Sequence, residues 1–204
     1  TNEQQYETTE EMIRDADAAM YQAKAAGRAQ AIIFDQAMHE KALNQLNLES
    51  DLRTALDNNQ FYLVYQPIVD LATKELHGFE ALLRWNHPTR GNISPAEFIP
   101  ITEDTGLIVP IGEWVLREAS RQLQQWNRTI RIDRPITVNV NLSMRQVCHP
   151  GIIETIRSVI EETGINPNHL KLEVTESTIV DDRHDMVPIL NQIREMGILL
   201  AMDD

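Results

Sequence analysis

The sequence predicts an α/β fold, in which helices alternate with the strands of a largely parallel sheet. Two β-rich segments, residues 61–71 and 75–85, are joined by only three residues, so they are expected to pair antiparallel. After residue 94, helical and strand-like segments alternate, and each intervening stretch is long enough to carry a crossover helix. The later strands are therefore expected to be parallel, next to an antiparallel first strand.

Composition sets the class of protein and excludes some functions. The 204 residues, 42% of them hydrophobic, are enough to bury the core of a medium-sized globular domain. A net charge of −13 argues against binding to long nucleic acids, because that affinity depends on basic residues that displace counterions. A small phosphate ligand fits this charge if metal ions neutralise it.

Compartment follows from the cysteine count and from apolar run lengths. The single cysteine, Cys148, excludes a disulfide framework within the chain and is typical of a reducing cytoplasm. No apolar run approaches the roughly 18 residues that a membrane span requires, and the polar N-terminus lacks a signal-peptide pattern. The chain is expected to be cytoplasmic and to make no membrane contact, although a larger parent protein could be membrane-anchored.

The N-terminal region predicts helices and no core of its own. Thr8 and Glu11 form a capping-box pattern before an amphipathic helix that ends at Gly27, and residues 31–34 read as a short strand. A stretch of about 34 residues is too short to enclose a core. Residues 35–58 are polar with one apolar face, which predicts a linker helix between this stretch and the later strands.

The paired strands bring charged and polar residues to one face. Period-two alternation puts Glu80, Leu82 and Arg84 on the same side of residues 75–85. Folding the sequence about residue 73 places Gln66 approximately opposite Glu80. Taken alone, Glu80 and Arg84 fit either a functional site or a surface ion pair, and Gln66 fits either a site or a local backbone interaction.

Further polar residues occur in the later strands. Residues 136–143 alternate strictly, with Asn139 and Asn141 on the polar face, and residues 170–177 place Glu173 in the same way. Asparagine is depleted in strands, so a polar lumen or site is expected, with a satisfied buried hydrogen-bond network as the alternative. The segment 198–204 ends in two further acids, Asp203 and Asp204.

These polar residues fall where α/β folds place their chemistry. Asn141, Glu173, Asp203 and Asp204 lie at the carboxyl ends of predicted parallel strands, the edge at which such folds build their sites. Together with Glu80 they form a set of oxygen ligands suited to Mg²⁺ or Mn²⁺. Neighbouring strand residues face opposite ways, so Asp203 and Asp204 approach from different angles, which suits a two-metal site of the kind that cleaves phosphodiesters.

Two segments resemble known families. Residues 16–24 (ADAAMYQAK), followed by Gly27-Arg28, are similar to the closing helix of a GGDEF (diguanylate cyclase) domain. The later motifs, in their order and spacing, resemble those of an EAL-domain cyclic di-GMP phosphodiesterase. They are Gln66-Pro67-Ile68, Glu80-Ala81-Leu82, Leu83-Arg84-Trp85, Asn139-Val140-Asn141-Leu142-Ser143, Glu173-Val174-Thr175-Glu176 and Asp203-Asp204.

The resemblance implies a fold and a domain division. The implied fold is a (βα)8 TIM-like barrel with an antiparallel first strand, truncated here after its fifth strand and preceded by the helical linker. Residues 1–34 would be the C-terminal remnant of a GGDEF domain, residues 35–58 the linker helix and residues 59–204 the N-terminal part of the EAL domain. Family members dimerise through this domain, so a homodimer is expected by analogy.

The resemblance also implies a reaction and roles for individual residues. The reaction is hydrolysis of cyclic di-GMP, a bacterial second messenger, to linear pGpG by a water that two Mg²⁺ or Mn²⁺ ions activate. Glu80 would be both a catalytic residue and a metal ligand. The other implied roles are metal binding for Asn141, Glu173, Asp203 and Asp204; substrate contact for Gln66, Leu82 and Arg84; and loop anchoring for Glu176.

One departure from the family concerns length. A (βα)8 barrel takes roughly 250 residues, and the family's lysine and later acidic positions follow the aspartate pair. The chain is therefore expected to be part of a longer protein and to be inactive alone. A catalytically silent cyclic di-GMP receptor is the alternative function, and an unrelated metal-dependent barrel enzyme would explain the acids but not the series of motifs.

Overall fold

The computed structural model describes residues 8–25, 36–129, 135–175 and 183–203, in two compact units that divide after residue 51. The first unit contains α1 (Thr9–Ala25), and α2 (Gln36–Ala55) crosses the division. The backbone N–H of Glu11 donates a hydrogen bond to Thr8 Oγ1 at 3.3 Å, which confirms the predicted helix start. The predicted strand at residues 31–34 lies outside the described residues.

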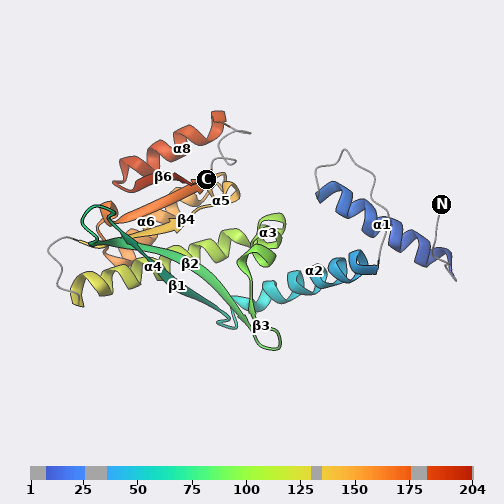
Figure 1. Ribbon diagram of the computed structural model, residues 1–204. Helices are drawn as coiled ribbons and strands as arrows, with labels where there is room; N and C mark the ends of the chain where they lie inside the picture. Colours follow the sequence, from blue (N-terminus) through green and yellow to red (C-terminus); the bar gives the residue numbers. More distant parts are fainter. Residues whose placement is uncertain (1–7, 26–35, 130–134, 176–182, 204) are drawn as a thin grey trace. The chain divides into compact units, whose positions relative to one another are not determined.

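The second unit is built on one mixed sheet (Figure 1), with strand order β1-β2-β4-β5-β6. The short strand β3 lies off this path and pairs with the C-terminal residues of β2. β1 and β2 are antiparallel, whereas β2, β4, β5 and β6 run parallel to one another, as the sequence predicts. The strands are β1 (Phe61–Val69), β2 (Leu76–His87), β3 (Gly91–Ile93), β4 (Thr137–Asn141), β5 (Leu170–Thr175) and β6 (Leu199–Asp203).

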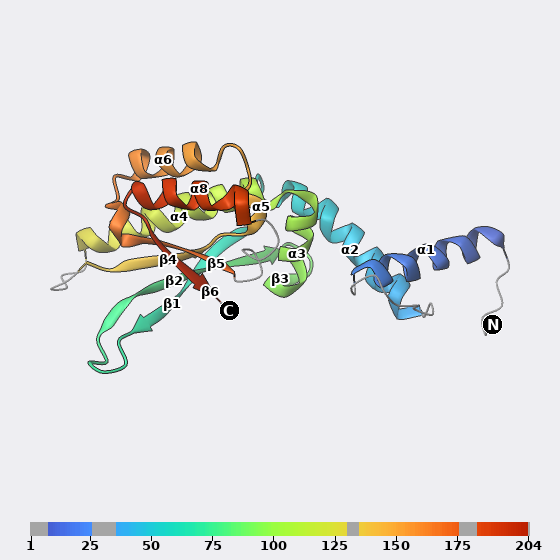
Figure 2. The same cartoon turned by 90° about the horizontal axis from the view of Figure 1, so that it is seen from above.

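Helices connect these strands, and α4, α6 and α8 lie over one face of the sheet (Figures 1 and 2). Gly164 ends α6 with φ 64°, and Gly197 follows α8 with φ 89°, so both predicted helix stops are confirmed. The helical segments of this unit are α3 (Pro95–Thr105), α4 (Ile108–Thr129), α5 (Met144–Val147), α6 (Ile152–Thr163), the 3₁₀ turn η1 (Pro167–His169) and α8 (Arg183–Glu195).

The core lies between this helical layer and the sheet. Val138 and Val140 of β4 and Leu170 and Leu172 of β5 are all buried, and they occupy the apolar positions of the predicted alternation. Burying one such side chain contributes roughly 1.5–3 kcal/mol relative to its exposure. Because this face is covered by helices, the polar residues at the intervening positions must point to the opposite face of the sheet.

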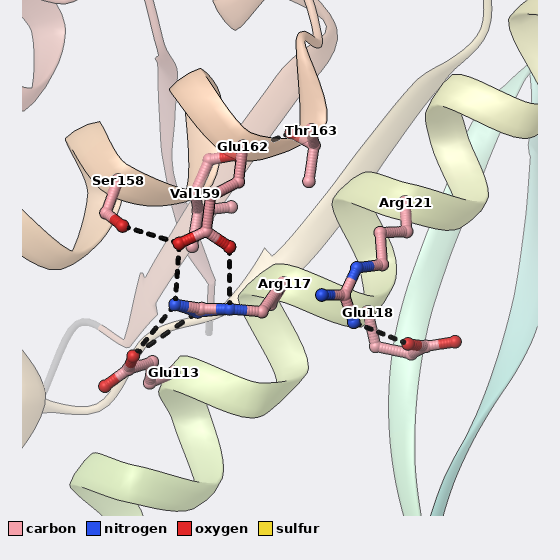
Figure 3. A network of polar contacts seen from close by, with 8 residues as sticks. All are labelled: Glu113, Arg117, Glu118, Arg121, Ser158, Val159, Glu162 and Thr163. Carbon is pink, nitrogen blue, oxygen red and sulfur yellow. Dashed lines mark hydrogen bonds and ion pairs between the residues drawn. The ribbon is translucent and has the colours of Figure 1, made fainter.

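An ion-pair network joins α4 to α6 on the outer surface (Figure 3). The guanidinium of Arg117 lies 3.1 Å from Glu113 Oε1 on its own helix and 3.2 Å from Glu162 Oε2 on α6. Ser158 donates a hydrogen bond of 2.8 Å to Glu162, which holds that carboxylate in place. The pairs are partly exposed, so we expect them to contribute about 1 kcal/mol or less and to orient the helices more than to stabilise them.

The short strand β3 is absent from the sequence prediction, which assigns residues 87–91 to a turn. A turn does follow His87, whose Nδ1 accepts the backbone N–H groups of Thr89 at 3.3 Å and Arg90 at 3.2 Å. The chain then pairs back onto β2, with Ile93 opposite Trp85. A strand of three residues is too short for alternation to reveal it.

The fold class is therefore α/β with a mixed sheet. Within the described residues the sheet is open, since β1 pairs only with β2 and β6 only with β5. The closed barrel remains a prediction. No helix in the described ranges is both long and apolar enough to cross a membrane.

Candidate functional site

Strand register brings the predicted site residues to one face. Gln66 pairs with Glu80 in the antiparallel hairpin, which confirms the position expected from the short connection. Glu80 pairs in turn with Asn139, and two residues further along β4, on the same face, Asn141 pairs with Glu173. Paired residues on neighbouring strands point to the same side of a sheet, so these side chains share the face opposite the helical layer.

Two hydrogen bonds cross between the rungs of this face. Asn141 Nδ2 donates to Glu80 Oε1 at 2.9 Å, and Asn139 Nδ2 donates to Glu173 Oε1 at 2.6 Å. The ammonium nitrogen of Lys171 lies 3.6 Å from that same oxygen of Glu173. An ionised carboxylate only accepts hydrogen bonds, so both amides must turn their NH₂ groups towards the acids in this arrangement.

Each carboxylate keeps one oxygen available. Among the described residues, no polar group contacts Oε2 of Glu80 or Oε2 of Glu173. The Glu173 side chain is 13% exposed, and among the described side chains only Ser120 Oγ is a fully buried polar atom without a partner, so Oε2 of Glu173 is not sealed off from solvent. Partly buried carboxylate oxygens and a neighbouring amide, with no sulfur and no imidazole, suit a hard divalent cation such as Mg²⁺ or Mn²⁺.

The acids of the C-terminal strand are only partly placed. Asp203 pairs with Thr175 at the carboxyl end of the sheet, although the direction of its side chain is not described. Asp204 and Glu176 lie outside the described residues. Among the described side chains, no group of three or more His, Cys, Asp or Glu residues is close enough to hold a metal ion. The described part of the site contains two glutamates, and each is hydrogen-bonded to an asparagine amide.

A cavity of about 1080 Å³ opens where β2, β4 and β5 meet α3, α4 and α5, and the site-face residues Leu82, Arg84, Asn141 and Glu173 contribute to its wall. Arg84 is half-buried, and its Nη1 donates to the Leu83 carbonyl oxygen at 2.8 Å. Its remaining N–H groups make no hydrogen bond to the residues that the structure describes and can donate to a ligand. Gln66 and Glu80 are not among the residues that line the cavity, and Gln66 is exposed on β1.

The family follows from comparison with known proteins. The model of the EAL domain matches residues 49–204. This chain belongs to the EAL-domain family. The bifunctional diguanylate cyclase/cyclic di-GMP phosphodiesterase MucR of Pseudomonas aeruginosa is 44% identical over 198 residues, which are 97% of this chain and 29% of MucR. The cyclic di-GMP phosphodiesterase NbdA of the same organism is 36% identical over 198 residues, 97% of this chain and 25% of NbdA. The chain spans about a quarter to a third of the length of these relatives.

Solved structures of EAL domains share the fold. The P. aeruginosa MucR phosphodiesterase in complex with c-di-GMP superposes with a TM-score of 0.73 at 44% identity, covering 78% of this chain and 63% of that one. The Xanthomonas citri FimX EAL domain in complex with c-di-GMP gives a TM-score of 0.68 at 26% identity, covering 82% of this chain and 63% of that one. Each is therefore a relative whose structure holds this cyclic dinucleotide.

The cavity of this EAL domain is also lined by three residues that the sequence did not predict: Glu103, Asp104 and Arg145. Arg145 of α5 donates hydrogen bonds to the carbonyl oxygens of Glu103 and Asp104, at the end of α3. Burial raises the pKa of the Glu103 carboxyl, with a further upward contribution from Asp104 that Arg145 opposes. A Ser-x-x-Gln capping box, Ser143 to Gln146, is a sequence signal for the start of α5, but it gives no signal for the contact of Arg145 with α3.

Proposed function

We propose that this EAL domain hydrolyses cyclic di-GMP to linear pGpG. The observation that carries the proposal is the pair of strand-borne carboxylates, Glu80 and Glu173, each held through one oxygen by an amide while the other oxygen accepts nothing from the described residues. Relatives named as cyclic di-GMP phosphodiesterases support the choice of substrate and reaction.

The metal ligands in this proposal are the oxygen-bearing residues of the site face. Glu80, Asn141, Glu173 and Asp203 would hold Mg²⁺ or Mn²⁺, and Asp204 would serve a second ion. Bound divalent ions supply Lewis-acid chemistry and lower the pKa of water, which phosphodiester hydrolysis needs near neutral pH. For Asn141 to act as a ligand, its amide must present Oδ1 to the ion; because its hydrogen bond to Glu80 uses Nδ2, that bond can be kept on binding.

Substrate contacts are assigned to residues around the cavity. Arg84 would pair with a phosphate, because a guanidinium matches the geometry of phosphate oxygens and only one of its N–H groups is used by Leu83. Leu82 would form part of the apolar wall, and Gln66 would reach the substrate from β1. Glu176 would anchor a loop beside the site.

The proposed reaction breaks one of the two phosphodiester linkages. The oxygen of water forms a bond to phosphorus, the bond from phosphorus to the 3′ oxygen breaks, and that oxygen leaves as a hydroxyl after taking up a proton. The product keeps a 5′ phosphate, as pGpG does. Glu80 is assigned the catalytic role because it lies opposite Gln66 and next to Asn141, between the proposed metal and substrate groups.

The test is turnover by the full-length protein. Incubation with cyclic di-GMP and Mg²⁺ or Mn²⁺ is expected to give pGpG on reversed-phase chromatography, and a chelator is expected to stop it. No pGpG with either metal would refute the hydrolase proposal. Binding of cyclic di-GMP in chelator, without turnover when metal is returned, would favour the catalytically silent receptor.

We also propose a setting for the domain. Residues 1–34 would close a GGDEF domain, residues 35–58 would link it to the EAL domain, and the protein would act in the cytoplasm as a homodimer. A GGDEF motif encoded upstream of residue 1 is expected on this view, and its absence would contradict the domain assignment. Light scattering of the full-length protein tests the dimer, and a monomeric mass would contradict it.

A further inference from the structure

Asn139 lies at the centre of the site face but outside the expected ligand set. It pairs with Glu80 on one side and with Lys171 on the other, and it is only 5% exposed. Asparagine is unfavourable in strands, and a buried amide without a partner costs about 1–3 kcal/mol. The residue therefore needs a specific partner at this position, and Glu173 is that partner.

The bond between them fixes one oxygen of the carboxylate. Asn139 Nδ2 lies 2.6 Å from Glu173 Oε1, at the short end for a hydrogen bond from N–H, as a charged acceptor favours. Lys171 approaches the same oxygen at 3.6 Å. No described residue makes a hydrogen bond or ion pair with Oε2, so the polar interactions on Oε1 set the rotation of the carboxylate and leave the other oxygen to face a ligand.

We propose that Asn139 is a positioning residue for Glu173, which holds the carboxylate in the orientation that binds the divalent ion. This inference rests on the proposed metal site. Asn139 does not line the cavity, and its amide is already turned towards Glu173, so it acts through that carboxylate without touching metal or substrate. Being neutral, it orients the acid without adding a positive charge that would compete with the ion.

The test compares two substitutions by valine on the same face of β4. Asn139→Val removes the donor and keeps a strand-compatible shape. Thr137→Val is the matched control, because Thr137 lies two residues before Asn139 on the same face and its hydroxyl donates to the His77 carbonyl oxygen, away from Glu173. Mn²⁺ alone is the probe, and free Mn²⁺ is measured by electron paramagnetic resonance in the full-length protein.

Asn139→Val is expected to weaken Mn²⁺ binding by about 10- to 100-fold, the usual effect of losing a group that orients a ligand. Thr137→Val is expected to stay within about twofold of wild type. In turnover, excess metal is expected to restore most of the kcat of Asn139→Val while the KM for cyclic di-GMP stays unchanged. Loss of thermal stability in chelator, with an unchanged Mn²⁺ affinity, would show a merely structural role and overturn the inference.

The outcomes separate this inference from the proposed function. No Mn²⁺ binding by wild type overturns both, whereas tight wild-type binding that Asn139→Val leaves intact overturns only the role of Asn139. If the variant does not fold, wild type labelled with ¹⁵N-asparagine answers the question by NMR. The side-chain NH₂ of Asn139 is expected to exchange slowly with solvent and to keep its bond when Mg²⁺ is added; rapid exchange would contradict the proposal.

Discussion

Replacing Glu80 by glutamine separates the chemical role of this residue from its structural role. Glutamine has nearly the same shape and still offers Oε1 to the NH₂ group of Asn141, which lies 2.9 Å from the present carboxylate oxygen. The strand pairing of Glu80 with Gln66 and Asn139 uses only the backbone, so it is unaffected. The variant therefore loses one negative charge and almost nothing else.

The expected magnitudes differ for stability and for function. A charge-assisted hydrogen bond exceeds a neutral one by about 1 kcal/mol, so the free energy of unfolding should fall by roughly that amount. In a domain of this size 1 kcal/mol corresponds to a fall in Tm of about 2–4 °C. Groups that only orient a metal ligand change affinity by 10- to 100-fold, so losing the charge of a ligand itself should cost at least about 100-fold in Mn²⁺ affinity and in kcat.

Three measurements on the full-length protein check these values: the Tm in chelator, the affinity for Mn²⁺ and the rate of pGpG release. Glu154→Gln is the matched control, because it removes the same charge from an exposed ion pair on α6, far from the site face. That control should leave metal affinity and rate within about twofold of wild type. A Glu80→Gln variant that binds Mn²⁺ as tightly as wild type would refute the role of Glu80 as a ligand.

Three further changes test other parts of the account. Arg84→Lys, which replaces a planar fork of donors by one ammonium, should raise the KM for cyclic di-GMP about tenfold, and an unchanged KM would argue against a phosphate contact. Trp85→Ala removes a fully buried ring whose Nε1 donates to Gln60 at 3.0 Å, and should destabilise the domain by about 3–5 kcal/mol in urea unfolding; a cost under about 1 kcal/mol would contradict this packing. Burial and the nearby Glu118 raise the pKa of Tyr65, so its stabilisation is complete below about pH 10 and lost as pH rises further. In the Tyr65→Phe variant, the free energy of unfolding should therefore fall less steeply between about pH 10 and 11 than in wild type. An equally steep fall would contradict a raised pKa for Tyr65.

The sequence determined the register of the site because local geometry left few choices. The sequence predicts a three-residue connection where the structure has residues 70–75, yet either is too short for a crossover, so the position of Gln66 opposite Glu80 could be predicted to within a residue or two and is confirmed. The helix stops at Gly164 and Gly197 were equally predictable, because a left-handed backbone conformation strongly favours glycine. Parallel pairing of the later strands followed from crossover length alone.

Side-chain partners could not be predicted in this way. Alternation places Asn139 and Asn141 on the site face, but it does not reveal that each bonds to the acid on the other rung. Nor does it reveal that Arg84 uses one N–H on the Leu83 carbonyl oxygen, since that depends on rotamers. The tie from Arg145 to the end of α3 joins residues about forty positions apart, a contact that only the folded chain brings about.

The most direct test of the central claim is anomalous diffraction from crystals of the full-length protein grown with Mn²⁺. The site face predicts a manganese peak bounded by Glu80, Asn141 and Glu173, with Oε2 of Glu173 turned towards the ion. The same carboxylate should retain its hydrogen bond from Asn139 through Oε1. A peak elsewhere, or a Glu173 that turns away from the ion, would contradict the account.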